Sequence, residues 1–402
     1  MTVAPKERNL ATTTRPRNPE PPVTRTVFPL QLVLMFADAT CATGMMWAVR
    51  VAYTLEQCWH RVPGGTGVAA LRTAEAMDGI AGLELVGVAG RHRNPPPEEW
   101  LPTIPWVQLP LRSPWLYESW LHAKWPRPEL VARDVDVVHA TTLIPCPTRK
   151  PLVVTLHDLA FLHNPENFTK HGIRVFRRSL DLIRSWADLV LCCSQATMDD
   201  CVAAGIGAER LRHVPLGVEF EHADPTDIDR VRLEYLLPDR YLLFVGTVEP
   251  RKNLRRLAEA IALLDEPLPL IVAGAEGWGD SVAGIKGDVR FLGFVPKQDL
   301  WALYAGAHVF CYPSVHEGFG LPVLEAMAQG TPVVTSGDTA TEEAANGAAI
   351  LVDPSDTADI ARGITEAASR RAELSNKGRH RVAQATWHST AELTVAAYRE
   401  LV

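Results

Sequence analysis

The feature that most constrains this chain is a regular alternation of short apolar runs with longer stretches of helical periodicity. In the first half the apolar runs fall at 49–55, 83–90, 136–140, 151–156, 189–193 and 211–215. Parallel strands read as continuous apolar runs because helices cover both faces of their sheet. The first half therefore predicts a parallel α/β sheet, with a helix at 67–77 after the first strand.

The same pattern restarts in the second half of the chain. A helical stretch at 253–264 separates the first two of six further apolar runs, which fall at 241–245, 268–273, 289–292, 308–312, 332–335 and 349–352. Two α/β sets of similar size predict two Rossmann-like domains, 46–215 and 216–385, which a length of 402 residues accommodates. Such sheets bind ligands at the carboxyl ends of their strands, so a site is expected in an inter-domain cleft. The amphipathic segment 386–402 is expected to form a helix that returns to the N-terminal domain.

The first 45 residues differ in composition from the rest. Residues 1–26 are rich in Thr, Arg and Pro, which is typical of disorder. The apolar run at 28–36 ends before Asp38 and is shorter than the roughly 20 residues that cross a bilayer. We interpret 1–45 as a disordered leader or a misassigned start, with Met45 or Met46 as the true start. A tail with its own role and a targeting segment are the alternatives.

The net charge and the cysteine content limit which partners and which cellular compartment are expected for the chain. The net charge is −7, so the chain has no overall electrostatic reason to bind nucleic acid. The seven cysteines show no metal-binding spacing, and they lie at 41, 58, 146, 192, 193, 201 and 311. We interpret them as reduced, buried thiols of a cytoplasmic protein.

Polar residues gather directly after the strand predicted at 241–245. Gly246 ends that strand, and Arg251 and Lys252 precede a helix that begins near Asn253. The backbone N–H groups of a helix start favour an anion, and two cations there repel each other unless a negative group lies between them. A diphosphate fits because Arg forks onto two oxygens and Lys adds a point charge. A solvated surface pair is the alternative.

A second polar segment follows the strand predicted at 308–312. Glu317 lies in a loop with Gly318 and Gly320, and Glu325 lies in the first turns of a helix that Pro322 opens and Gly330 closes. The glycines would let a ligand approach the backbone, and the carboxylates could accept hydroxyl hydrogens from a sugar or ribose. The segment predicts a nucleotide-sugar pocket. The alternative is that the two carboxylates only complement the helix dipole. This alternative explains Glu325 well, but it explains the Glu-x₇-Glu spacing poorly.

Two of these segments resemble a known family. Glu317-Gly-Phe-Gly-Leu-Pro-Val-Leu-Glu325 is similar to the E-x₇-E motif of GT4-type retaining glycosyltransferases of GT-B fold, and the segment from Gly246 to Asn253 resembles their diphosphate segment. The similarity runs from about Val49 to Tyr398. It implies a metal-independent transfer of a hexosyl group from a nucleoside diphosphate sugar.

The resemblance also implies roles for single residues. Arg251 and Lys252 would hold the donor diphosphate, and Glu317 would bind hydroxyls of the transferred sugar. Backbone donors would come from Gly318, Phe319 and Gly320, and Gly246 would also contact the donor. Glu325 would hold the ribose. Val295, within the segment 293–296, would contact the base through its backbone. Two departures stand out: Thr247 replaces an Arg of some members, and Pro215-Leu-Gly217 replaces an Asn-Gly step at the domain joint.

The first half would supply the rest of the site. Gly64 and Gly65 belong to a loop, 64–67, that opens a helix and matches the family's glycine loop near the phosphates. His157 ends the strand predicted at 151–156 and matches the family's histidine near the reacting sugar. As a neutral imidazole it could accept a hydrogen bond or orient the acceptor. A purely structural hydrogen bond is the alternative for a histidine at a strand end.

Two competing motifs are weaker. Residues 65–70 fit G-x-G-x-x-A, but about nine residues separate the strand from the first glycine, and Gly90-Arg-His-Arg93 offers no acidic residue for a ribose. Asp134-Val-Asp136 fits a bare D-x-D, yet it enters an apolar strand and is interpreted as structural. We therefore expect neither a nicotinamide cofactor nor a metal ion: Arg251, Lys252 and helix N-termini would stabilise the leaving diphosphate.

The acceptor is less legible. Trp100, Trp106, Trp115, Trp120 and Trp125 lie in an apparently irregular segment, 95–128, and could form an acceptor wall or pack a long loop. The cations Lys170, Arg174, Arg177, Arg178 and Arg184 follow at partly helical spacing and suit a solvated face, an anionic acceptor or a membrane surface.

The sequence therefore predicts a hexosyltransferase of polysaccharide, glycolipid or glycoconjugate biosynthesis. The donor is expected to be GDP-mannose first and a UDP-hexose second, the acceptor a glycan or a lipid-linked glycan, with peripheral contact at the inner face of the membrane left open. Three alternatives share the architecture: a sugar-nucleotide epimerase, a phosphorylase, and a non-catalytic nucleotide-sugar-binding protein.

Overall fold

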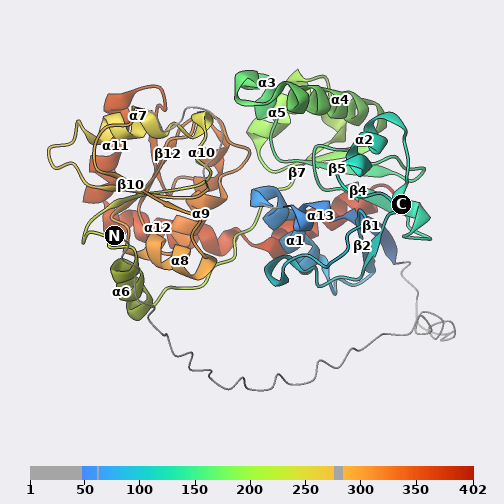
Figure 1. The fold of residues 1–402 in the computed structure, drawn as a ribbon, viewed down its shortest axis with the longest axis horizontal. Helices are drawn as coiled ribbons and strands as arrows, with labels where there is room; N and C mark the ends of the chain where they lie inside the picture. The colour runs from blue at the N-terminus through green and yellow to red at the C-terminus, as the bar shows by residue number, and fades with distance from the viewer. Residues whose placement is uncertain (1–47, 61–62, 276–283) are drawn as a thin grey trace, which may run out of the picture. The chain divides into compact units, whose positions relative to one another are not determined.

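The computed structural model describes residues 48–60, 63–275 and 284–402, which form two parallel sheets with helices around each (Figure 1). We call the residues around the first sheet the first lobe and those around the second the second lobe. The predictions for residues 1–45, including the apolar run at 28–36, the start at Met46 and Cys41, lie outside the described residues.

The first lobe has a seven-stranded sheet within the described residues, in the order β3-β2-β1-β4-β5-β6-β7, and every adjacent pair is parallel. Its strands are β1 Val49–Thr54, β2 Leu83–Ala89, β3 Trp106–Gln108, β4 Val137–Ala140, β5 Leu152–Leu156, β6 Leu189–Cys192 and β7 Leu211–His213. Its helices are α1 Gly64–Met77, α2 Trp115–His122, α3 Ala160–His163, α4 Lys170–Trp186 and α5 Gln195–Ala203.

The second lobe has a six-stranded parallel sheet in the described residues, ordered β10-β9-β8-β11-β12-β13. Its strands are β8 Leu242–Val245, β9 Leu270–Ala273, β10 Val289–Gly293, β11 Val309–Tyr312, β12 Val333–Ser336 and β13 Ile350–Val352. The helices that follow the first lobe in sequence are α6 Pro225–Glu234, α7 Leu254–Ile261, α8 Lys297–Gly306, α9 Leu321–Ala328, α10 Ala340–Ala345, α11 Thr357–Ser369, α12 Arg371–Gln384 and α13 Trp387–Arg399.

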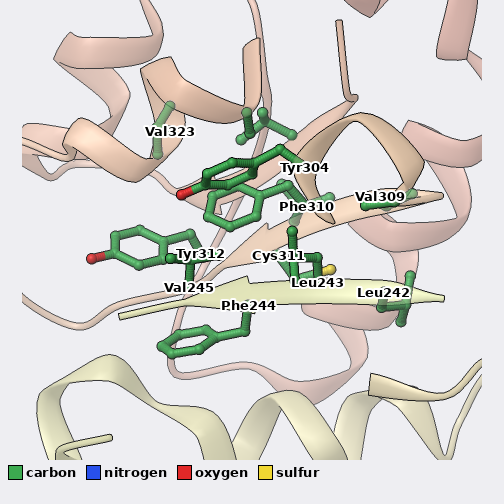
Figure 2. Packing of buried hydrophobic residues seen from close by; sticks show 14 of the residues in the cluster. Leu242, Leu243, Phe244, Val245, Tyr304, Val309, Phe310, Cys311, Tyr312 and Val323 are labelled. Atoms are coloured by element: carbon green, nitrogen blue, oxygen red, sulfur yellow. The ribbon is translucent and has the colours of Figure 1, made fainter. Parts of the chain in front are cut away.

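The central apolar runs form these sheets because they are buried along their whole length. All four residues of β8 and all four of β11 are buried. The Tyr312 ring of β11 stacks with both Phe244 of β8 and Phe310 of β11, and Tyr304 of α8 packs against Phe310 (Figure 2). Such rings each remove a large apolar area from water, so they fix the two central strands firmly. The predicted parallel α/β architecture is confirmed.

Side-chain caps fix where several helices begin. The side chain of Thr169 accepts a hydrogen bond from the N–H of Gly172 at α4, and that of Ser194 accepts one from Thr197 at α5. Each cap satisfies a backbone donor that has no partner within its own helix. At α9 the first residues are Leu321 and Pro322, as the predicted position of the proline requires.

The last helix, α13, packs in the first lobe although it follows the second in sequence. It contacts α1, and both lie in the lobe that carries β1 and β2 (Figure 1). The Tyr398 hydroxyl lies 2.6 Å from Nδ1 of the buried His139 of β4. At the joint, the N–H of Val218 donates to the carbonyl of Ala385 at 3.0 Å, and a β-carbon on Gly217 would lie 2.2 Å from the nitrogen of Trp387. Gly217 is therefore required where the two connections cross.

The prediction that 95–128 is irregular was wrong, because this segment holds strand β3 and helix α2. A three-residue strand at the sheet edge is too short to give a periodic signal. Of its tryptophans, Trp120 is buried in the first-lobe core, whereas Trp115 and Trp125 are exposed. Within the described ranges, no helix is both long and apolar enough to cross a bilayer.

Candidate functional site

The candidate site begins where the strand order of the second sheet reverses. Strands β8 and β11 are neighbours in the sheet but are not consecutive in the chain. Arg251 and Lys252 follow β8, and Glu317 follows β11. A parallel sheet opens a crevice beyond the carboxyl ends of its strands at such a switch point. The topology thus explains why two segments 65 residues apart meet.

Arg251 lies within a 3₁₀ turn, Pro250–Lys252, and forms two ion pairs. Its Nη1 donates to Oε2 of Glu317 at 2.8 Å and to the carbonyl of His316 at 3.1 Å. Its Nη2 lies 2.7 Å from Oε1 of Glu249, which the sequence analysis did not single out. A guanidinium has five N–H donors, so these contacts leave capacity for a ligand.

Lys252 is enclosed by an aromatic ring and two oxygens. Its Nζ lies 2.5 Å from Oε1 of Glu317, 4.8 Å from the ring centroid of Tyr312, and also donates to the Tyr312 hydroxyl. Figure 2 shows that hydroxyl, and the hydroxyl of Tyr304, on the side of Val245, which is the carboxyl end of β8. Only 8% of the Lys252 side chain and 7% of the Glu317 side chain are exposed.

These contacts correct one interpretation of the sequence. The two cations were taken to require an external anion between them, but Glu317 of the chain itself lies between them. Burial alone would raise the pKa of Glu317, yet Lys252 and Arg251 outweigh burial and lower that pKa to about 2. Glu317 is therefore ionised and acts as an internal counter-ion. Each carboxylate oxygen has a further lone pair, so sugar hydroxyls can still donate to it.

Glu325 makes a separate contact, one turn into α9. Its Oε2 accepts from the Tyr304 hydroxyl at 2.8 Å, and burial raises its pKa. Val295 and Phe319 are both buried in the apolar core of the second lobe, and Phe294 beside Val295 is largely exposed. The ribose, base and backbone roles expected for these residues stay predictions.

In the first lobe, His157 directly follows β5 and is partly buried. Its Nε2 lies 3.3 Å from the carbonyl oxygen of Thr141. Because that oxygen can only accept, Nε2 carries the hydrogen and Nδ1 carries the lone pair. Burial lowers the pKa of His157, although Asp158 partly opposes this, so the imidazole is neutral at pH 7. This is the protonation state that the sequence hypothesis requires.

The two lobes meet directly at His157 and Gly318. A β-carbon on Gly318 would lie 2.0 Å from the His157 carbonyl oxygen, which no other residue could tolerate. The Cys193 thiol donates to the carbonyls of His157 at 3.2 Å and of Gly318 at 3.1 Å, and Thr197 lies at 3.3 and 3.4 Å from the same oxygens. The expectation that Gly318 makes room for a ligand thus needs correction: the space is filled by protein backbone.

Other predicted glycines have distinct structural reasons. Gly320 has φ +115° at the start of α9, and Gly64 has φ +62° at the start of α1, so both occupy the left-handed region. A β-carbon on Gly65 would lie 4.0 Å from Cδ1 of Leu321, which brings α1 next to α9 across the lobe junction. Gly246 ends β8, and its N–H donates to the carbonyl of Ala273 at 2.9 Å.

The two remaining motifs have structural explanations. Asp136 directly precedes β4, and its Oδ2 accepts from the N–H of Arg50 on the neighbouring β1 at 2.9 Å, which fits the structural interpretation of the D-x-D. A small cavity of about 20 Å³ lies beside His157 inside the first lobe, lined among others by His139, Thr155 and Thr390. It has room for about one water molecule.

Sequence reasoning missed four residues of this site. Glu249 and Tyr312 contact the two cations, and Cys193 and Thr197 join the lobes. Glu249 lies within the segment from Gly246 to Asn253, so its place in that motif could have predicted a contact with Arg251. Tyr312 could be recognised only as a strand residue, and the thiol's partners are 36 and 125 residues away.

Comparison with known proteins identifies the family. A model described as "Glycosyltransferase Family 4" matches residues 63–222, and one described as "Glycosyl transferases group 1" matches residues 227–386. O-antigen chain mannosyltransferase B of Escherichia coli is 34% identical over 267 residues, which cover 62% of this chain and 70% of the relative. The chain belongs to the GT4-type glycosyltransferases.

Two further relatives match over smaller shares of their own length. Serotype-specific mannosyltransferase WbdA of E. coli is 30% identical over 62% of this chain, which spans 33% of that relative. D-inositol 3-phosphate glycosyltransferase of Geodermatophilus obscurus is 36% identical over 48% of each chain.

The solved structures show the GT-B fold. HepE of Anabaena, in complex with UDP and glucose, superposes with a TM-score of 0.66 at 20% identity, covering 88% of this chain and all of that one. WaaG, a glycosyltransferase involved in lipopolysaccharide biosynthesis, gives a TM-score of 0.62 at 17% identity over 88% and 99%. The two-domain GT-B prediction is confirmed.

Proposed function

We propose that this glycosyltransferase moves a mannosyl group from a nucleoside diphosphate sugar, GDP-mannose first, to a hydroxyl of a glycan or lipid-linked glycan acceptor. The observation that carries the proposal is the buried cluster of Arg251, Lys252 and Glu317, which lies next to Gly318 and its contact with His157. Several relatives that the chain matches are mannosyltransferases by name, which supports the sugar. A UDP-hexose is the second candidate, supported by the UDP complexes of a structural neighbour.

The proposed chemistry proceeds with retention. The bond between the anomeric carbon and the diphosphate oxygen breaks, and its electron pair leaves with the diphosphate. Arg251 and Lys252 stabilise the charge that develops there, without a metal ion. The acceptor oxygen bonds to the same face of the anomeric carbon, and its proton passes to the departing phosphate. Closure of the lobes excludes water and so limits hydrolysis.

Glu317 and His157 position the sugar in this scheme. Glu317 accepts hydroxyl hydrogens while it keeps the two cations in place. The lone pair at Nδ1 of His157 accepts a hydroxyl hydrogen of the donor sugar or of the acceptor. Both groups fix the reacting atoms rather than form a covalent intermediate.

We further place the enzyme in the cytoplasm with a peripheral membrane contact. The six cysteines in the described residues are free and buried, which supports a reducing compartment. Lys170, Arg174 and Arg177 are exposed on α4, and exposed Trp115 lies on the adjoining α2. Cations beside an exposed indole suit an anionic lipid surface. Co-sedimentation with vesicles that contain anionic lipid, lost on R174E/R177E, tests this.

The decisive experiment offers GDP-mannose, UDP-glucose and ADP-glucose to the purified protein in the presence of a chelator. Selective thermal stabilisation names the nucleotide by mass action. A mannosylated acceptor whose anomeric configuration matches the donor, by NMR, supports the proposal. An inverted product, transfer that requires Mg²⁺, or a donor sugar changed without any acceptor contradicts it.

A further inference from the structure

A second cluster of polar side chains lies beside the predicted donor site and is not used by the proposed transfer. It consists of His163 at the end of α3, Asp200 on α5, and His316, which directly precedes Glu317. One nitrogen or oxygen ligand atom from each of the three lies within 4.8 Å of the other two. We call these three residues the His-Asp-His cluster.

The geometry of the His-Asp-His cluster places one carboxylate between two imidazoles. Nε2 of His163 lies 2.7 Å from Oδ1 of Asp200, and Nε2 of His316 lies 3.8 Å from Oδ2 of the same carboxylate. The two rings are 4.6 Å apart at their centroids, with 34° between their planes. Both imidazoles thus present the same nitrogen to the same acidic group.

This donor set matches a particular class of ion. Two imidazole nitrogens and a carboxylate oxygen, with a fourth position left to water, suit Zn²⁺ and related transition ions better than Mg²⁺ or Ca²⁺. Ligand atoms around tetrahedral Zn²⁺ are about 3.3 Å apart, since each bond is about 2.0–2.1 Å. The spacings in the cluster reach that value with small side-chain rotations.

The surroundings allow these rotations and give access to solvent. The His163 side chain is 46% exposed, whereas those of Asp200 and His316 are each 17% exposed. Asp158 lies near enough to His316 to add a favourable negative charge. Arg251, the nearby cation, already pairs with Glu249 and Glu317.

We propose that His163, Asp200 and His316 bind a Zn²⁺ ion that joins the two lobes. His163 and Asp200 belong to the first lobe and His316 to the second, so one ion ties the loop that carries Glu317 to α3 and α5 (Figure 1). No metal-binding spacing is visible along the chain because 37 and 116 residues separate the ligands. The ion would lie beside the proposed diphosphate residues, and the transfer proposed above does not use it.

The site has a consequence that rests on the proposed function. Donor entry and product release require the loop at 316–317 to move relative to the first lobe. An ion that bridges the lobes holds this loop and slows turnover, while it stabilises the folded chain. Micromolar Zn²⁺ is therefore expected to inhibit transfer, and a chelator to restore it.

The test measures metal binding to the full chain by calorimetry, after removal of metals with a chelator. Zn²⁺ is titrated into the wild type and into H163A, D200N and H316N, with Mg²⁺ as the ion that should not bind. H388N is the matched control, because His388 makes an exposed ion pair with Glu392 on α13. Co²⁺ replaces Zn²⁺ in a parallel titration, and its visible absorption reports the ligand geometry.

The proposal predicts one Zn²⁺ per chain in the wild type and in H388N. Each cluster variant should weaken binding by at least about 100-fold, since even outer-shell partners of a metal are worth 10–100-fold. Exposed His163 makes H163A a variant that folds. Wild-type Zn²⁺ affinity retained in all three cluster variants, or no Zn²⁺ binding by a folded wild type, would overturn the site.

The lobe-joining role is read separately from the proposed transfer. Zn²⁺ should raise the melting temperature of the wild type and not that of H163A. A bound ion that leaves wild-type turnover unchanged contradicts the inhibitory role alone. If no sugar is transferred by any form, the proposed function fails, and the calorimetry still decides the metal site.

Discussion

The carbonyl oxygen of His157 and the α-carbon of Gly318 meet so closely that a β-carbon on Gly318 would lie 2.0 Å from that oxygen. The contact joins the end of β5 in the first lobe to the loop that carries Glu317 in the second. It sets the distance between the imidazole and the carboxylate that are proposed to face the donor sugar. The glycine is thus required by the fit between lobes.

Gly318→Ala is expected to lower transfer on the order of 100-fold, because the methyl group must separate the lobes by about an ångström and misplace the reacting groups. Steady-state transfer and a thermal melt would measure this, and each lobe should remain folded. Gly337→Ala is the control, since a β-carbon there would meet only ordinary contacts, the nearest at 3.8 Å. Equal activity in both variants would show that the lobe contact does not position the site.

Glu317→Gln should separate nucleotide binding from transfer. The variant removes the negative charge that pairs with Lys252 and Arg251, although Arg251 keeps its ion pair with Glu249. The affinity for GDP should therefore rise roughly tenfold, given about 1–4 kcal/mol for a close charge pair near a protein surface. Transfer should fall by about 10²–10³-fold because the sugar loses an acceptor that is ordered in advance.

Calorimetry with GDP and a transfer assay check both parts of this prediction. Glu373→Gln is the control, because Glu373 pairs with Arg370 on the protein surface. A fall in GDP affinity in a folded Glu317→Gln protein would contradict this prediction. It would mean that Glu317 aids GDP binding by holding the two cations in position, and that this outweighs its competition for their charge.

The sequence predicted the sheets well because their central strands are buried along their whole length. The apolar runs at 241–245 and 308–312 gave β8 and β11 to within one residue. The edge strand β3 was not predicted, because a half-buried run of three residues is too short to show a hydrophobic periodicity. Local patterns thus predicted the strands that read as apolar runs of four or more residues, including the partly exposed β10.

Only those site residues that lie in contiguous sequence motifs could be predicted from the sequence. Arg251, Lys252 and Glu317 come from two contiguous motifs, and the strand order brings them together. That Glu317 already pairs with both cations, while Glu249 pairs with Arg251 as well, is a property of side-chain geometry. The His-Asp-His cluster depends on the lobe contact, so no spacing along the chain could indicate it.

Cys193 is predicted to hold the lobe contact through its thiol. Cys193→Ala removes the donor to two buried carbonyls and should lower the free energy of unfolding by about 1–2 kcal/mol, with a several-fold loss of transfer. Cys193→Ser keeps a donor there and should preserve most of the transfer.

Chemical unfolding and transfer assays of these variants test the thiol's role. Cys146→Ala is the comparison, because Cys146 packs in the first-lobe core and should cost stability without a matching loss of transfer. If Cys193→Ser loses as much transfer as Cys193→Ala, side-chain packing rather than hydrogen bonding explains the residue.

His139 predicts how stability changes with pH. Burial lowers its pKa to about 3 from 6.5, and its two nitrogens contact Tyr398 and Thr155. Below pH 6.5 the unfolded chain gains a proton that the folded protein does not bind, so this contribution is full above pH 6.5 and is lost progressively toward pH 3. One proton changes the unfolding free energy by about 1.4 kcal/mol per pH unit.

Urea unfolding between pH 6 and pH 4 would measure this slope. In the double variant H139F/Y398F both partners are replaced by rings that do not titrate, so the slope should be smaller than in the wild type by up to one proton. His157 is neutral too, and it also lowers the pKa of His139, so the difference reports His139 together with its coupling to His157. Identical slopes in two folded proteins would mean that His139 is already protonated, and would place a charge beneath α13 where the structure has a neutral hydrogen bond.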